Sequence, residues 1–433
     1  MNLRTSTATI YSGKGAWIRA MNIGIIGMGG FARSHHRAIL DLESKGECRL
    51  VCTCDPSIGN FADMSREMEF STRGVALFDD YIEMLDECRE ELDIVTIPTP
   101  LPLHAEMHRA CVERGLAAYL EKPPTLDYVE LEDMLGVEAG AAKLTNVGFS
   151  NIIEEPRQAL KRQILSGAFG PVRKVSFRGL WPRAASYFRR TYWAGRLVLD
   201  GRLVLDSCMG NAMAHYVHNA LFWVGSGGLY SWGEVDRVQA EMYRAHDIEG
   251  PDTVFVKALT SDGIELRLAL SHACAGDHVQ CESVACEEAI IEYDASGCYT
   301  IGRTDGTREM ETFDSGDILA RNLSAYLEYV RGDRDRPISR LIDSRPFVVF
   351  CDLAYVAAGA IHTVPSAMVP THKDAEEDDY FASIEGIEEV SDRFLEDDLF
   401  PSEQGVAWGR AGGAAGAGDL ARLSEVVAGL AAR

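Results

Sequence analysis

The sequence lacks three features that would point to particular classes of protein. No apolar run reaches the roughly 20 residues that a membrane-spanning helix needs, and residues 1–20 contain no apolar signal-peptide core. The eleven cysteines are scattered, and the close pairs Cys52/Cys54 and Cys281/Cys286 lack the second pair that a structural zinc site requires. We therefore expect a cytoplasmic protein with reduced thiols and no bound metal.

Basic residues are also in deficit. The chain has 42 Lys and Arg against 66 Asp and Glu, which gives a formal charge of −24. Such a charge repels polyanions and argues against nucleic acid or an anionic membrane as a partner. The hydrophobic content of 46% is ordinary for a globular protein, and 433 residues suit two domains with modest extensions.

The first strong pattern is a glycine turn between a strand-like apolar run and a helix-like segment. The run covers residues 22–26 and is followed by Gly27-Met28-Gly29-Gly30-Phe31-Ala32. Glycine at 27 lets a strand end sharply, glycine at 29 lets a pyrophosphate approach the backbone, and a small residue at 32 allows close helix–strand packing. The N-terminus of the helix adds free amides and a partial positive charge, so the turn predicts phosphate binding.

A second predicted strand, residues 49–54, ends in Asp55. A carboxylate at this place accepts hydrogen bonds from both ribose hydroxyls of a dinucleotide. The same charge would repel a 2′-phosphate, and Pro56 and Ser57 follow instead of an arginine. The sequence therefore favours NAD over NADP.

Strand-like and helix-like segments alternate up to residue 150, which is typical of a doubly wound parallel sheet. Further strands are expected at 75–78, 93–97, 116–120 and 144–149. Ligands bind beyond the carboxyl ends of such strands. Two segments fall at that edge, so the candidates for cofactor contact there are Thr99, Pro100, His104, Glu121 and Lys122.

Strand follows strand after residue 151, which predicts an α+β domain with a largely antiparallel open sheet. We expect its strands at 172–177, 238–243, 254–259, 264–271 and 284–293. Its helices are expected at 155–165, 318–330 and 347–361. The predicted organisation is thus a Rossmann domain over 21–150 and a substrate and oligomerisation domain over 151–370.

The flanks of these domains have their own composition. We expect residues 1–20 to be a disordered leader, with Met21 as a candidate start. Residues 371–410 combine an acidic loop with a charged amphipathic helix that packs on the domains. Residues 411–433 are rich in Gly and Ala, which predicts a flexible tail that ends in a short helix.

Several motifs together resemble one family of oxidoreductases. In order and spacing, the glycine turn, Asp55-Pro56, Thr99-Pro100 with His104, Glu121-Lys122-Pro123 and a helix with His215 resemble the glucose-fructose oxidoreductase, inositol dehydrogenase and MocA (Gfo/Idh/MocA) family, over roughly residues 21–364. The resemblance implies hydride transfer between NAD and a secondary hydroxyl of a sugar, cyclitol or related polyol. By analogy with other folds, an open antiparallel face in the second domain would suit a homodimer or homotetramer.

Two other functions stay open on the same fold. One is an NAD-dependent glycoside hydrolase that oxidises a sugar carbon transiently. The other is a non-catalytic regulator that senses a sugar or nucleotide, which the departure at Asn211 described next keeps open.

The resemblance also implies a reactive pair. In the family, the lysine of Glu-Lys-Pro acts with a histidine of the second domain, often with an aspartate four residues before the histidine. Lys122 and His215 match these positions, but Asn211 stands where the aspartate is expected. An asparagine orients an imidazole but carries no negative charge. His215 is the leading base for the hydroxyl proton, with Lys122 polarising the oxygen or itself transferring the proton.

Candidate substrate contacts lie around this helix. His218 is one turn from His215 and therefore on a similar face. The segment 181–193 is dense in arginines and aromatic residues, of which we select Arg183, Tyr192 and Trp193, although an interface loop would have the same composition. The tandem Gly-Arg-Leu-Val-Leu-Asp that ends at Asp206 predicts a hairpin or extended loop.

Overall fold

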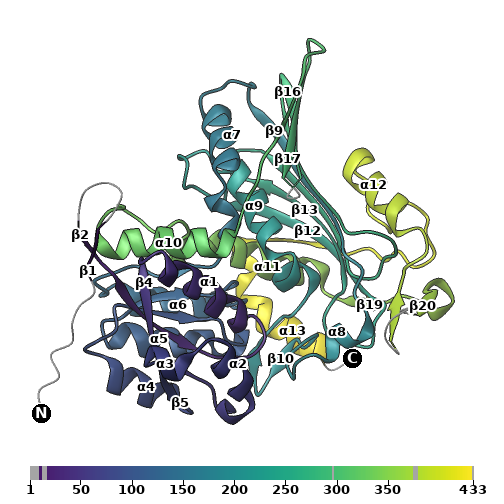
Figure 1. Ribbon diagram of the computed structural model, residues 1–433. Helices are drawn as coiled ribbons and strands as arrows, with labels where there is room; N and C mark the ends of the chain where they lie inside the picture. Colours follow the sequence, from purple (N-terminus) through teal and green to yellow (C-terminus); the bar gives the residue numbers. More distant parts are fainter. Residues whose placement is uncertain (1–8, 12–16, 295–296, 374–378, 432–433) are drawn as a thin grey trace, which may run out of the picture. The chain divides into compact units, whose positions relative to one another are not determined.

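The computed structural model describes residues 9–11, 17–294, 297–373 and 379–431 (Figure 1). Contacts divide the chain into two compact units. The N-terminal unit comprises residues 1–124, 130–153 and 316–342, and the C-terminal unit comprises residues 125–129, 154–315 and 343–433. No helix within the described ranges is long and apolar enough to cross a membrane.

The N-terminal unit contains a six-stranded sheet in which every pair of neighbours is parallel. Its strands lie in the order β5 (Ala76–Phe78), β4 (Cys48–Cys54), β3 (Met21–Ile26), β6 (Ile94–Ile97), β7 (Ala117–Leu120) and β8 (Asn146–Val147). The order reverses between β3 and β6, which is the switch point where such sheets bind ligands. The predicted doubly wound fold is therefore confirmed.

Helices connect these strands and bury their apolar stripes on the sheet. They are α1 (Ala32–Ser44), α2 (Ala62–Glu67), α3 (Phe70–Arg73), α4 (Tyr81–Cys88), α5 (His104–Glu113) and α6 (Tyr128–Glu138). A later helix, α10 (Ile318–Arg331), also belongs to this unit and shares a core with α1 through residues such as Leu42, Leu323 and Leu327. The chain thus returns to the N-terminal unit from within the range 151–370 expected for the second domain.

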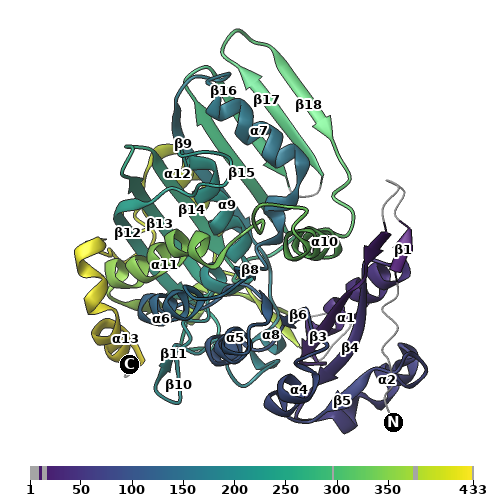
Figure 2. The ribbon, with the colours of Figure 1, turned by 90° about the vertical axis from the view of Figure 1, so that its left-hand side faces the viewer.

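The C-terminal unit contains a large, mainly antiparallel sheet (Figure 2). Its strands lie in the order β18 (Arg308–Thr312), β17 (Cys298–Arg303), β16 (Ala289–Asp294), β15 (Val279–Cys286), β9 (Val172–Leu180), β14 (Glu265–Ser271), β13 (Thr253–Thr260), β12 (Val235–Arg244) and β19 (Ile361–Thr363). Among these described strands only β9–β14 and β12–β19 pair in parallel. The predicted α+β domain with a largely antiparallel sheet is confirmed.

Helices cover both faces of this sheet. The helices of the unit are α7 (Glu155–Leu165), α8 (Ala185–Arg189), α9 (Ala214–Val224), α11 (Arg345–Ala358), α12 (Ile387–Asp397) and α13 (Leu423–Ala431). Figure 1 shows α9 and α11 on one face and α12 on the other. Short hairpins are formed by β10 (Val198–Leu199) with β11 (Arg202–Leu203) and by β20 (Thr371–Lys373) with β21 (Tyr380–Ala382).

The two flanking predictions need correction. In the predicted disordered leader, β1 (Thr9–Tyr11) and β2 (Trp17–Arg19) pair as antiparallel strands, while residues 1–8 and 12–16 lie outside the described residues. In the predicted flexible tail, β22 (Ala414–Gly416) pairs with β12. A side chain at Gly412 would collide with the carbonyl oxygen of Ala240, so glycine here serves close packing. The acidic segment 374–378 lies outside the described residues.

Candidate functional site

The glycine turn after β3 adopts the conformation that its sequence predicts. Gly27 has φ +105° and Gly30 has φ +55°, in the left-handed region that favours glycine. The N–H of Gly27 donates to the carbonyl oxygen of Cys54 at 2.8 Å, which joins the turn to the end of β4. Ala32 is fully buried as the first residue of α1, as close helix–strand packing requires.

Free backbone amides gather at this turn. The N–H groups of Gly29, Gly30 and Phe31 have no acceptor among the residues that the structure describes. The first turn of α1 contains no acidic residue, and no side chain caps it. Unpaired amides at the start of a helix bind phosphate oxygens, so these residues fit the pyrophosphate of a dinucleotide. The Met28 side chain is buried and contributes its backbone alone.

Asp55 is held in place at the end of β4 by two backbone amides. Its Oδ2 accepts from the N–H of Met28 at 3.0 Å, and its Oδ1 accepts from the N–H of Ser57 at 2.9 Å. Each carboxylate oxygen keeps a further lone pair for a ribose hydroxyl. The nearby Arg33 is paired with Glu67 on the surface, so the position favours the 2′-hydroxyl of NAD.

His104 lies beneath the two neighbouring strand-end loops rather than on their surface. Its Nε2 is 2.9 Å from the carbonyl oxygen of Thr99, and its Nδ1 is 2.9 Å from that of Pro123. Burial lowers the pKa of His104, although both carbonyls oppose this shift. His104 thus ties the two loops together, and its contact with the cofactor stays a prediction. Thr99 and Pro100 stay half-buried at the loop surface.

Glu121 forms a buried pair that the sequence did not indicate. Its Oε1 is 2.9 Å from Nε2 of His35, and its Oε2 accepts from the N–H of Lys122 at 3.1 Å. Burial alone would raise the pKa of Glu121, but the His35 hydrogen bond and the Lys122 charge hold it below its usual value. A Cβ at Gly148 would lie only 2.8 Å from Oε1, so the carboxylate is tightly enclosed. Glu121 thus supports the Lys122 backbone, and its contact with the cofactor stays a prediction.

The two histidines of α9 differ in burial. His215, the second residue of α9, is half-buried. His218 is fully buried, with its ring centroid 4.9 Å from that of Trp232, and burial lowers its pKa well below the usual value. The His218 side chain thus packs in the core of the unit, and its contact with a substrate stays a prediction.

Asn211 has a carboxylate beside it. It lies in the π-helical turn Cys208–Ala212 before α9, and its Nδ2 donates to Oδ1 of Asp206 at 2.8 Å. Asp206 is buried, and its Oδ2 accepts from the N–H of Gly195 at 2.6 Å. The carboxylate that Asn211 lacks is thus supplied by Asp206, the last residue of the tandem segment.

A buried network docks α9 on the sheet. Glu282 of β15 receives two hydrogen bonds from Arg157, at 2.7 and 2.9 Å, and others from Asn219 and Trp223 of α9. Lys161 donates to the carbonyl oxygens of Phe222, Trp223 and Gly225 at the end of the helix. The residues that donate and accept these hydrogen bonds are buried. The helix that bears His215 is therefore firmly held.

The remaining substrate candidates lie in the loop after β9. Tyr192 is 59% exposed, whereas Trp193 is 8% exposed and Arg183 is half-buried. Arg183 and Trp193 belong to one group of stacked arginine and aromatic side chains.

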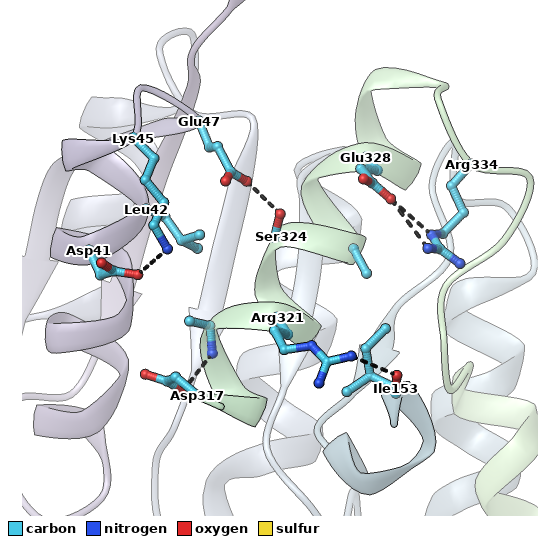
Figure 3. A pocket seen from close by; sticks show the side chains of 12 residues that line it. Asp41, Leu42, Lys45, Glu47, Ile153, Asp317, Arg321, Ser324, Glu328 and Arg334 are labelled. Carbon is cyan, nitrogen blue, oxygen red and sulfur yellow. Dashed lines mark hydrogen bonds and ion pairs between the residues drawn. The ribbon is translucent and has the colours of Figure 1, made fainter. Parts of the chain in front are cut away.

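A pocket of about 350 Å³ in the N-terminal unit lies away from these residues (Figure 3). It is lined by the end of α1 and by α10, whereas the glycine turn is at the start of α1. Its charges are mutually paired: Lys45 lies 2.6 Å from Asp41, and Arg334 lies 3.3 Å from Glu328. The pocket is therefore at the amino edge of the sheet, opposite to the edge where dinucleotides bind.

Comparison with known families identifies the N-terminal unit. Residues 21–149 match the Gfo/Idh/MocA family model, described as the oxidoreductase family with an NAD-binding Rossmann fold. The class of protein is thus an NAD-binding Rossmann protein. Residues 21–149 thus match the family that the motifs of the sequence indicated.

The alignments with curated relatives cover only part of each relative's length. Inositol 2-dehydrogenase of Rhodococcus jostii is 35% identical over 83 residues, which cover 19% of this chain and 23% of that protein. Inositol 2-dehydrogenase of Rhizobium meliloti is 24% identical over 178 residues, covering 40% of this chain and 49% of that protein. The chain thus spans about a quarter to a half of these relatives.

Solved structures share the fold over most of the chain. The WlbA dehydrogenase of Bordetella pertussis, in complex with NADH and UDP-GlcNAcA, is 20% identical with a TM-score of 0.63, covering 78% of this chain and 97% of that one. A putative myo-inositol dehydrogenase of Sinorhizobium meliloti is 18% identical with a TM-score of 0.59, covering 78% and 97%. At these identities the matches show a shared fold.

Proposed function

We propose that the protein is an NAD-dependent oxidoreductase that transfers a hydride between a secondary hydroxyl carbon of a sugar, cyclitol, polyol or related sugar derivative and the nicotinamide. One observation carries the proposal. The carboxyl edge of the parallel sheet presents the free amides after Gly27, the oriented carboxylate of Asp55 and the Lys122 turn, which the His35–Glu121 pair supports from below.

The residues of this edge fit the cofactor. The amides of Gly29, Gly30 and Phe31 would hold the pyrophosphate, and Asp55 would hold the ribose hydroxyls. When bound, NAD supplies the hydride acceptor at C4 of its nicotinamide ring.

The chain's own residues handle the proton. An alcohol that loses a hydride from carbon must also lose a proton from oxygen to become a carbonyl. We assign the proton acceptor to a ring nitrogen of His215, with Lys122 donating a hydrogen bond to the oxygen as its negative charge develops. In the reverse assignment Lys122 is the base. The pH dependence of turnover in a variant of Lys122 and in a variant of His215 distinguishes the two assignments. Asn211, held by Asp206, orients the His215 side of the site.

The relatives support the substrate class. Two curated relatives are named inositol 2-dehydrogenases, and a structure with the same fold is a dehydrogenase in complex with NADH and UDP-GlcNAcA. Cyclic polyhydroxylated compounds are therefore the substrates to examine first.

The experiment is NADH formation, followed by absorbance, across a panel of polyols, sugars, sugar acids and nucleotide sugars. The proposal predicts NADH formation with at least one class. Release of free sugar from a glycoside without net NADH would favour an NAD-dependent glycoside hydrolase instead. Binding of NAD and a sugar without any turnover would favour a sensor.

A further inference from the structure

Five side chains of the C-terminal unit form one stacked group, which we name the arginine–aromatic cluster: Trp181, Arg183, Tyr187, Arg190 and Trp193. The guanidinium of Arg183 lies 4.8 Å from the ring centroid of Tyr187 and 5.6 Å from that of Trp181. The guanidinium of Arg190 lies 3.8 Å from the Tyr187 centroid and 5.6 Å from that of Trp193. Two cations therefore share one aromatic ring.

The two arginines of the cluster have no carboxylate partner within the described part of the chain. Their neighbour Arg189, by contrast, lies 3.6 Å from Asp379. The nearby Asp206 is engaged by Asn211 and by the N–H of Gly195.

Hydrogen-bond donors in the same place are also unsatisfied. Nε of Arg183, Nε1 of Trp181 and Nε1 of Trp193 are buried and have no acceptor among the described residues. The hydroxyl of Thr191, two residues before Trp193, is buried without a partner as well. Guanidinium and indole N–H groups only donate, and buried donors without acceptors are rare in native proteins. Arg190 is exposed, and its Nη1 donates to the carbonyl oxygen of Tyr187 at 2.6 Å. The missing acceptors are therefore those of Arg183 and of the two indoles.

The backbone that bears the cluster is held before any ligand binds. The N–H of Trp181 donates to the carbonyl oxygen of Ser271 at 2.9 Å, and that of Arg183 donates to the carbonyl oxygen of His272 at 3.2 Å. The ring of His246 lies between Asp252, at 2.8 Å, and the carbonyl oxygen of Arg183, at 3.2 Å. Such preorganisation lowers the entropy lost on binding.

We propose that the arginine–aromatic cluster binds an anionic group of the substrate, either a carboxylate or a phosphate. The inference rests on the proposed function and narrows its substrate class to sugar acids, sugar phosphates or nucleotide sugars. Anionic oxygens supply the missing acceptors and neutralise Arg183 and Arg190, whereas neutral hydroxyls would leave both charges uncompensated. Planar guanidinium groups fixed on aromatic rings suit the planar fork of a carboxylate and the oxygens of a phosphate.

The test measures binding to the NAD-loaded full-length protein by calorimetry. The probes are glucose, glucuronate, glucose 6-phosphate and UDP-glucose, which differ in charge around one sugar. We expect at least one anionic probe to bind about 10- to 100-fold more tightly than glucose, as charge-assisted hydrogen bonds allow. The best of the three anionic probes distinguishes a carboxylate from a phosphate or diphosphate.

Variants locate the effect. Arg183→Gln and Arg190→Gln should each reduce this preference about tenfold or more, while Arg183→Lys should keep part of it because it keeps the charge. Arg189→Gln is the matched control, since Arg189 is exposed and paired with Asp379, and should leave the preference unchanged. Melting temperatures of the variants verify that each one folds.

Failure of this inference is distinguishable from failure of the proposed function. Equal binding of glucose and all anionic probes, or a preference that survives both Gln variants, would overturn the inference even if neutral polyols reduce NAD. Absence of NADH with every substrate would overturn the proposed function, whereas the anion preference is measured by binding alone.

Discussion

The imidazole of His35 and the carboxylate of Glu121, which are 86 residues apart in the chain, meet at 2.9 Å inside the N-terminal unit. His35 lies on the first turn of the helix that follows the glycine turn, and Glu121 precedes Lys122. The pair therefore links the proposed phosphate-binding helix to the proposed catalytic lysine.

Replacing this histidine should impair both stability and turnover. His35→Leu leaves the buried Glu121 carboxylate without its side-chain donor, which should cost about 1–3 kcal/mol of unfolding free energy. We expect kcat to fall more than NAD affinity, because the Lys122 backbone rests on the same carboxylate. His35→Gln, which can still donate, should recover part of kcat. Unchanged denaturation and kcat in His35→Leu would contradict this role.

Asn211→Asp should destabilise the protein at neutral pH, although it restores the aspartate expected at this position. The new carboxylate would face Asp206 across the present 2.8 Å hydrogen bond, and two such groups cannot both stay ionised at low cost. We expect a loss of about 1–3 kcal/mol relative to the unmodified protein at pH 7.5. The difference should shrink at pH 5, where the pair can share a proton. Equal stability at pH 7.5 would show that the two side chains do not meet.

Arg157→Met should be among the most destabilising substitutions in the C-terminal unit. It removes both hydrogen bonds to Glu282 and leaves that carboxylate buried without its cation. Breaking a buried ion pair in this way costs about 3–5 kcal/mol. The matched control is Arg173→Met, an exposed arginine paired with Glu287, which should cost less than about 1 kcal/mol by urea denaturation. Similar losses of unfolding free energy in both variants would contradict the proposed contribution of this network to stability.

Acid should weaken the fold through buried histidines. Burial lowers the pKa of His36 and His108 to about 4 and that of His272 to about 3, from an ordinary value of 6.5. Below pH 6.5 the unfolded chain therefore binds protons that the folded chain does not, and stability is lost as the pH falls toward these folded values. Each histidine contributes a loss of up to about 1.4 kcal/mol per pH unit.

The measurement is the unfolding free energy between pH 7 and pH 4.5. The slope of this free energy against pH reports the protons taken up on unfolding. His36→Gln should lower that number by about one, because glutamine does not titrate. A pH dependence identical to that of the unmodified protein would show that His36 does not contribute in this way.

Local patterns were sufficient to predict the N-terminal fold. The apolar run before Gly27, the strand ending in Asp55 and the later strands are each set by periodicity and turn residues, and their order defines the parallel sheet. The predicted strand 284–293 is instead the hairpin of β15 and β16, because two glutamates, Glu287 and Glu288, turn the chain within an otherwise strand-like run. The return of α10 to the N-terminal unit depends on long-range packing that no local pattern encodes.

The sequence predicted the candidate side chains of the site better than the residues that hold them in place. His35 and Asp206 act through contacts with Glu121 and Asn211, and nothing in their neighbouring residues distinguishes them from ordinary polar side chains. The burial of His218 also depends on a distant residue, Trp232. Sequence patterns thus indicated groups that could meet a ligand, whereas the tertiary fold determines which groups position them.

The most direct test of the proposed oxidoreductase is a comparison of Lys122→Ala with Lys45→Ala, an exposed lysine at the opposite edge of the same sheet. Each is assayed for NADH formation on the best substrate and for NAD binding by calorimetry. Lys122→Ala should lower kcat on the order of 100-fold or more with NAD affinity largely retained, and Lys45→Ala should change neither. Unchanged kcat in Lys122→Ala would contradict the proposed site.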